Sequence, residues 1–478
     1  MTRGSRIKRN SVFAFLSRVI RLVTNVLLFV GIARLYGVEA FGQFTAAHTL
    51  STIFLLLADF GFDSLLPTEI AARRERAAEY ARRYFSMKVL FAVGASLVML
   101  VLSVFQETSS ETRTLVQIFS LYVFFASLNN YFFALFKSFE QFHHETLISF
   151  VTNAILLLLL IVLGILHSPL YVLAICFVGT RIIGIVMGLK TAARLTQGRI
   201  IQMSFEGWKD VWKDVMVFGL QFVLGALFLQ LDTVLISFLK GDRDVGIYQA
   251  AFKIIALVLI VPDVVITTVM PVLARLFVEN RARWESLGRL FTKTLLLLGL
   301  PLCVIPFVYA KEMIVLVYGA EGFDESIHIL RLLLMTVFIR FSVAEAYAMM
   351  LTTSRRQGRR LAIVGGGTLL SFLLNLLFIP HYGPSGAATV ALITNVIAGV
   401  GFVLASGDSF VAWTCNVRNV ASSGIVVSVG AVAWGMPSIP MWCGAPVILV
   451  MSAATLYFIG FTREEWSLVF VREKDFVQ

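Results

Sequence analysis

The sequence predicts an all-α polytopic membrane protein, and its composition, its hydropathy and the pattern of its apolar runs support this fold class. Hydrophobic residues make up 58% of the 478 positions, charged residues only 14%, and the mean hydropathy is +0.85. A soluble domain averages about 45–50% apolar and about 25% charged residues, so a water-soluble fold could not bury this much apolar surface. Runs such as AILLLLLIVLGIL (154–166) do not alternate polar and apolar residues, which excludes a barrel of membrane strands and indicates spanning helices.

Apolar windows separated by charged breaks predict about fourteen transmembrane helices. The last two windows are the weakest, so twelve spans remain the alternative. The predicted spans are 12–33, 42–66, 86–105, 115–136, 146–166, 169–189, 215–239, 246–271, 291–310, 328–351, 361–379, 384–406, 420–437 and 440–461.

The distribution of Lys and Arg predicts the orientation of these spans. With the N-terminus inside, most of the 40 basic residues fall in cytoplasmic segments, among them TRGSRIKR (2–9), RRERAAEYARR (73–83) and RRQGRR (355–360). Both termini are therefore expected in the cytoplasm. The first span is long and lacks a small-residue cleavage site, which favours a retained helix over a removed signal peptide. Attraction to anionic membrane lipids accounts for the net charge of +11 without any nucleic acid.

One eleven-residue pattern occurs twice. GVEAFGQFTAA begins at Gly37, and GDRDVGIYQAA begins at Gly241, 204 positions later. The same offset aligns Asp59 with Asp263 and Pro67 with Pro271. Since six predicted spans separate the copies, the pattern indicates two parallel six-helix repeats facing a central cavity. The expected domains are an N-terminal bundle (1–200), a C-terminal bundle (201–410), and two additional helices with a cytoplasmic tail (411–478).

Several stretches resemble those of a known family of transporters. RLYGVEAFGQFTAAHTLSTIFLLLADFGFDSLLPTEIA (34–71) and QLDTVLISFLKGDRDVGIYQAAFKI (230–254) are similar to the starts of the two halves of polysaccharide-biosynthesis flippases. These are the Wzx-type members of the multidrug/oligosaccharidyl-lipid/polysaccharide exporter superfamily. VLVYGAEGFDESIHIL (315–330) and IPHYGPSGAATVALIT (379–394) are similar to later signatures of that family. The resemblance covers about residues 10–410.

The resemblance implies a flippase of the inner, cytoplasmic membrane for polyprenyl-pyrophosphate-linked oligosaccharides, working by alternating access in the export of O-antigen, lipopolysaccharide or another surface polysaccharide. It also implies a proton or sodium coupling ion, and a polysaccharide polymerase and chain-length machinery as partners. Within the superfamily, a lipid II flippase and a cation-coupled multidrug exporter are the alternatives. The sequence has no GxxxxGK[ST] loop, and we expect no cofactor. A membrane enzyme is disfavoured because no large loop carries acids, bases or metal ligands.

Charged residues inside predicted spans are the candidate functional residues, because burying a charge in a bilayer is costly. Arg18, Arg21 and Asn25 follow the i, i+3, i+7 spacing that places them on one helix face. This cationic stripe predicts a wet cavity that binds a pyrophosphate or acidic sugars. The alternative is that the arginines extend to the inner headgroups or form structural ion pairs.

Four further charged residues lie in the predicted spans. Asp232 and Lys253 lie at similar depth on consecutive spans, which favours a structural salt bridge, with a cavity cation and a coupling acid as the alternative. Arg181 and Arg340 are further cavity candidates.

Together with Asp232, three further acidic residues are candidates for ion coupling or gating. Asp59 and Asp263 occupy repeat-related positions, for which helix-end capping or gate contacts are the favoured interpretation. Glu345 is a candidate for carrying a coupling proton, or for pairing with Arg340.

Three other patterns are not interpreted as catalytic or metal sites. The triplet DRD (242–244) is expected on the outer side, away from nucleotide sugars. The triplet HHE (143–145) is expected in a cytoplasmic loop without further ligands, and the segment RRERAAEYARR is expected on the inner headgroups.

Overall fold

The computed structural model describes residues 3–105, 109–195, 230–407, 413, 416–436, 439–462 and 465. In this part of the chain the secondary structure is helical, with no strand, which confirms the predicted all-α fold class. The chain forms two compact units, Met1–Gln249 and Ala250–Gln478. The boundary predicted between residues 200 and 201 lies outside the described residues.

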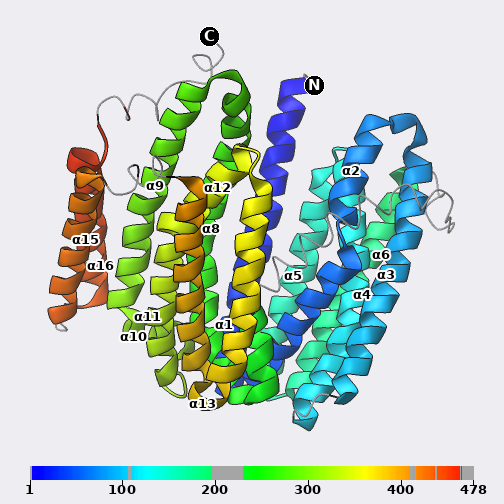
Figure 1. Ribbon diagram of the computed structural model, residues 1–478. Helices are drawn as coiled ribbons and strands as arrows, with labels where there is room; N and C mark the ends of the chain where they lie inside the picture. The colour runs from blue at the N-terminus through cyan, green and yellow to red at the C-terminus, as the bar shows by residue number, and fades with distance from the viewer. Residues whose placement is uncertain are drawn as a thin grey trace. The chain divides into compact units, whose positions relative to one another are not determined.

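The first unit is a bundle around one central helix, α4 (Figure 1, blue to cyan). Helix α4 packs against five neighbours, and its many buried residues include aromatic side chains such as Phe119, Tyr131 and Phe136. The helices are α1 (Arg3–Asp59), α2 (Phe62–Ala72), the 3-10 turn Arg74–Arg76, α3 (Ala77–Phe105), α4 (Ser110–Ser138), α5 (Phe142–Ile165) and α6 (Leu170–Leu195), and the short apolar helix Gln230–Leu239 follows.

The second unit contains most of α8 and the helices that follow it (Figure 1, green to red). Here α15 packs against both α9 and α16. The elements are α8 (Asp242–Glu279), α9 (Arg281–Val308), α10 (Ala310–Tyr318), α11 (Asp324–Ile339), the π-helix Arg340–Glu345, α12 (Ala346–Thr353), α13 (Gln357–Ser406), α15 (Val417–Gly435), α16 (Met441–Thr455) and the π-helix Leu456–Gly460.

The helices agree with the predicted spans. Eleven helices of the described residues are long and apolar enough to cross a membrane. Two of them, α1 and α13, break at Gly37 and Gly383 and each contains two predicted spans, so the eleven account for all predicted spans except 215–239. The first part of that span lies outside the described residues, and its end is the short helix Gln230–Leu239.

The two copies of the repeated pattern contact each other inside the first unit. A Cβ atom on Gly42 would clash with the backbone carbonyl of Asp242, and a Cβ atom on Gly246 would clash with that of Val38. The offset of 204 relates Gly42 to Gly246 and Val38 to Asp242, so each copy makes the same contact with the other. Glycine at both positions permits this close backbone approach, since any side chain would separate the helices.

Candidate substrate-binding site

A polar cavity of about 440 Å³ lies inside the first unit. Helices α1, α2, α4, α5 and α6 contribute its walls, so residues far apart in the sequence meet there. Its lining includes three of the predicted cavity residues, Arg21, Asn25 and Arg181. Buried polar space of this kind must be filled by water or by hydrogen-bonding groups of a ligand.

The charged side chains of the cavity carry a net positive charge. Arg21, Lys137 and Arg181 are cationic, and Asp63 and Glu145 are anionic, which leaves three positive charges against two negative ones. Charges that are partly buried interact more strongly than charges in solution. The cavity therefore favours anionic groups over cationic ones.

Arg21 is held by an ion pair at one wall of the cavity. Its guanidinium donates to Glu145 Oε1 at 3.0 Å and to Ser149 Oγ at 3.2 Å. Glu145 is only 2% exposed, and its other oxygen lies 3.4 Å from Lys137 Nζ. Arg21 thus combines the two interpretations that the sequence left open, because it lines the cavity and also forms an ion pair.

Arg181 lies against aromatic rings instead of a carboxylate. Its guanidinium carbon lies 5.2 Å from the ring centroid of Phe177 and 5.6 Å from that of Tyr122, which are cation–π distances. Among the described residues no carboxylate forms an ion pair with Arg181, and its Nε atom has no hydrogen-bond partner. Arg181 is therefore the cation of the cavity that is best placed to bind an anionic ligand.

Amide and aromatic side chains form much of the remaining wall. Asn25, Asn130 and Asn153 offer amide groups, and the buried Asn129 has an Oδ1 atom without a hydrogen-bond partner in the described residues. The ring of His48 packs in an aromatic cluster, with its centroid 5.3 Å from that of Phe29 and 5.9 Å from those of Phe119 and Phe177. Such a mixture of amides and aromatic surfaces suits hydroxyl-rich groups such as sugars.

The structure places the other predicted site residues elsewhere. Arg18 is exposed on α1 and is not part of the cavity wall, although it lies only three residues from Arg21. In the second unit, Arg340 forms an ion pair with Glu345 at 2.8 Å, which is the pairing that the sequence left open.

Lys253 is half-buried on α8 of the second unit. Asp232, in the first unit, accepts a hydrogen bond from Tyr248 at 2.8 Å. The predicted salt bridge between Asp232 and Lys253 stays a prediction.

The two repeat-related aspartates have different surroundings. Asp59 is the last residue of α1 and accepts hydrogen bonds from Ser127 and Asn130, each at 2.8 Å. Asp263 is exposed within the continuous helix α8. The expected equivalence of these positions therefore does not extend to their contacts.

One sequence-based interpretation was wrong, and one buried charge was missed. The triplet HHE is not in a loop, because residues 143–145 lie in the first turn of α5 and Glu145 is buried at the cavity. Lys88, which follows the basic segment assigned to the headgroups, is completely buried on α3. Its position two residues inside a predicted span was the one signal for this burial.

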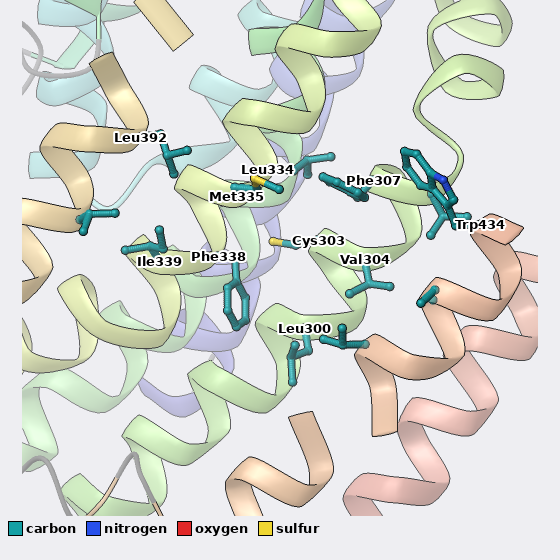
Figure 2. Close-up of a pocket in the computed structure, with 15 residues that line it drawn as sticks. Leu300, Cys303, Val304, Phe307, Leu334, Met335, Phe338, Ile339, Leu392 and Trp434 are labelled. Atoms are coloured by element: carbon teal, nitrogen blue, oxygen red, sulfur yellow. The ribbon is translucent and has the colours of Figure 1, made fainter. Parts of the chain in front are cut away.

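The second unit contains a cavity of different character. It has a volume of about 670 Å³ and is lined by apolar side chains of α9, α11, α13 and α15. Figure 2 shows Leu300, Phe307 and Phe338 among them, with the indole of Trp434 at one side. This lining offers almost no hydrogen bonds, so it suits hydrocarbon and not a charged head group.

Comparisons with known proteins agree with this fold. Residues 7–277 match the family model described as "Polysaccharide biosynthesis protein". No curated protein sequence matches the chain.

Three solved structures share the fold. A lipid II flippase MurJ, in an inward closed conformation, aligns with 98% of this chain and 99% of its own at 14% identity and a TM-score of 0.68. An inward-facing multidrug resistance MATE family transporter of the MOP superfamily aligns with 84% of this chain and 99% of its own at 16% identity and a TM-score of 0.67. A MOP superfamily transporter from Pyrococcus furiosus, described as having a binding pocket of reverse polarity, aligns with 85% and 96% at 17% identity and a TM-score of 0.59.

Proposed function

The chain belongs to the polysaccharide biosynthesis protein family, and from this premise we propose that it flips a polyprenyl-pyrophosphate-linked oligosaccharide from the cytoplasmic to the outer leaflet of the inner membrane. The product would serve the export of a surface polysaccharide. Neither a pyrophosphate nor a hydrated sugar crosses hydrocarbon unaided, whereas a polyprenyl tail can stay in lipid throughout. The protein therefore has to supply a polar path for the head group.

The single observation that carries this proposal is Arg181 in the polar cavity. Its cationic group is not neutralised by any carboxylate of the described residues, and amide and aromatic side chains line the same cavity. A pyrophosphate would form charge-assisted hydrogen bonds with such a guanidinium, and the amides and aromatic rings would contact the sugars. Arg21 and Lys137 add positive charge at the same cavity, while Glu145 fixes their positions.

The cavity also bears on the two alternatives within the superfamily. A drug exporter that binds organic cations needs cavity walls that are both acidic and aromatic. Aromatic rings are present here, but the surplus positive charge argues against such a substrate. The substrate of a lipid II flippase also has a pyrophosphate-linked head group, so the positive charge of the cavity fits both lipid substrates. We favour the oligosaccharide because of the family match.

We also propose an orientation of the protein in the membrane and partners that use its product. Both termini would lie in the cytoplasm, and the contact between the two glycine-containing copies would lie on the outer side. Single cysteines at the exposed Ser109 and at Ser385, in a cysteine-free background, should react with an impermeant maleimide added outside, whereas one at Arg356 should not. A polysaccharide polymerase with its chain-length machinery would use the product.

Deletion of the gene tests the proposed function. We expect the lipid-linked oligosaccharide to accumulate while the amount of surface polysaccharide falls, because synthesis continues without transport. Failure to make the lipid-linked precursor would favour an enzyme instead. A change in drug sensitivity alone would favour an exporter.

A further inference from the structure

A buried ion triad lies beside the cavity. The ammonium of Lys88 on α3 is 2.8 Å from Asp59 and 2.5 Å from Asp63. Lys88 is completely buried, Asp59 is 13% exposed, and Asp63 is 31% exposed because it lines the cavity. The triad therefore connects the protein interior with the space in which we place the substrate head group.

The triad lies at a break in a membrane helix. Helix α1 ends at Asp59 and α2 begins at Phe62. Between them, Phe60 and Gly61 have positive φ angles of 34° and 86°. Left-handed backbone is strained for a residue such as Phe60, so the break persists only because the surrounding contacts hold it. Transporters place coupling-ion sites at such discontinuous helices.

The charges of the triad do not balance. One ammonium faces two carboxylates, which leaves one surplus negative charge in a largely buried place. Asp59 has further donors in Ser127 and Asn130, whereas among the described residues Asp63 accepts a hydrogen bond from Lys88 alone. Two carboxylates that share a site in this way favour the uptake of one proton. Asp63 is the carboxylate that can accept this proton directly from the cavity.

The geometry favours a proton over a metal ion. The ammonium of Lys88 occupies the position between the two carboxylates where a metal ion would bind. The described residues contain no group of three metal-ligating side chains.

The triad is specific to the first half of the chain. The repeat offset of 204 places Thr267 at the position of Asp63 and Thr292 at the position of Lys88, so the second half has neither charge.

We propose that Asp63 is a proton-binding carboxylate of the transport cycle, and that its protonation frees α2 from its ion pair with α3. Neutral Asp63 leaves Lys88 paired with Asp59 alone, and the break at Phe60 and Gly61 then allows α2 to move relative to α1. This coupling role rests on the proposed transport function, whereas proton binding does not. The other charged or titratable groups of the cavity are Arg21 and His48 on α1, Tyr122 and Lys137 on α4, Glu145 on α5 and Arg181 on α6.

Infrared spectroscopy of the purified full-length protein in lipid nanodiscs tests the assignment without any substrate. We expect a protonated-carboxyl band of a buried group that grows as the pH falls, and we expect Asp63→Asn to abolish it. Glu69→Gln, which changes a carboxylate of the same helix α2, should leave the band in place. Asp63→Asn should fold, because Lys88 keeps Asp59 as a partner in a neutral pair.

Asp59→Asn is a second test, because a purely structural role for Asp63 would not change the pH midpoint of the band in this variant. With one carboxylate left for Lys88, the midpoint of the band should move to lower pH by about one unit or more. A band that persists in Asp63→Asn, or a midpoint that Asp59→Asn leaves unchanged, would overturn the proposal. Loss of the band when sodium chloride replaces choline chloride would assign the site to sodium instead. A protein that titrates as expected but moves no lipid-linked oligosaccharide would contradict the proposed function alone.

Discussion

Replacement of Arg181 by glutamine is the sharpest test of how the cavity recognises its substrate. The change removes the guanidinium that stacks on Phe177 and Tyr122 and has no carboxylate partner among the described residues. The charged groups of the cavity then become two cations against two anions. A hydrogen bond to a charged group contributes about 1.5–3 kcal/mol, so the variant should bind a pyrophosphate about ten to a hundred times more weakly.

Binding of farnesyl pyrophosphate to the purified protein in nanodiscs measures this effect. Arg18→Gln is the matched control, because it removes an arginine that is exposed and lies outside the cavity wall. The control should bind the probe within about twofold of the unchanged protein, since a single exposed charge contributes little. Equal losses in both variants would mean that general surface charge attracts the probe. No loss in Arg181→Gln would refute the assignment of this cavity to the pyrophosphate.

Two further predictions concern the stability of the first unit, measured by thermal unfolding in detergent. Arg21→Gln should destabilise the protein by about 1–3 kcal/mol, because Glu145 is buried but Arg21 is 35% exposed and Lys137 still contacts Glu145. The double variant with Glu145→Gln should recover most of this loss, and no recovery would contradict the pairing. Gly246→Val should cost about 1–3 kcal/mol by forcing its side chain against the Val38 carbonyl. Gly94→Val, where nothing lies within 4 Å of an added Cβ, should cost little, and an equal effect at both positions would disprove the close contact.

Hydropathy was enough to predict the helical fold, because the lipid environment forces apolar spans of fixed length. The repeat offset relates the two glycines of an important contact. Gly42 and Gly246 pack on each other's copy of the pattern, a contact that the sequence analysis did not predict. The offset extends to the third helix of each half, since α3 begins at Ala77 and α9 begins at Arg281, which is 204 positions later.

The candidate site was only partly predictable, because lateral contacts between helices leave little trace in one sequence. Helical spacing grouped Arg18 with Arg21, yet only Arg21 contacts Glu145 and Ser149 of α5. The burial of Lys88 depends on Asp59 and Asp63, which lie more than twenty positions away along the chain. A charge near the end of a span can be placed only when its partners are known.

The leaflet distribution of the lipid-linked oligosaccharide tests the central claim most directly. The measurement depletes the protein in cells and then determines the fraction of this lipid that a membrane-impermeant oxidant of sugars can reach from outside. Our account predicts that the accessible fraction falls while the total amount rises, and that Arg18→Gln restores it but Arg181→Gln does not. An accessible fraction that is unchanged by depletion would contradict the account.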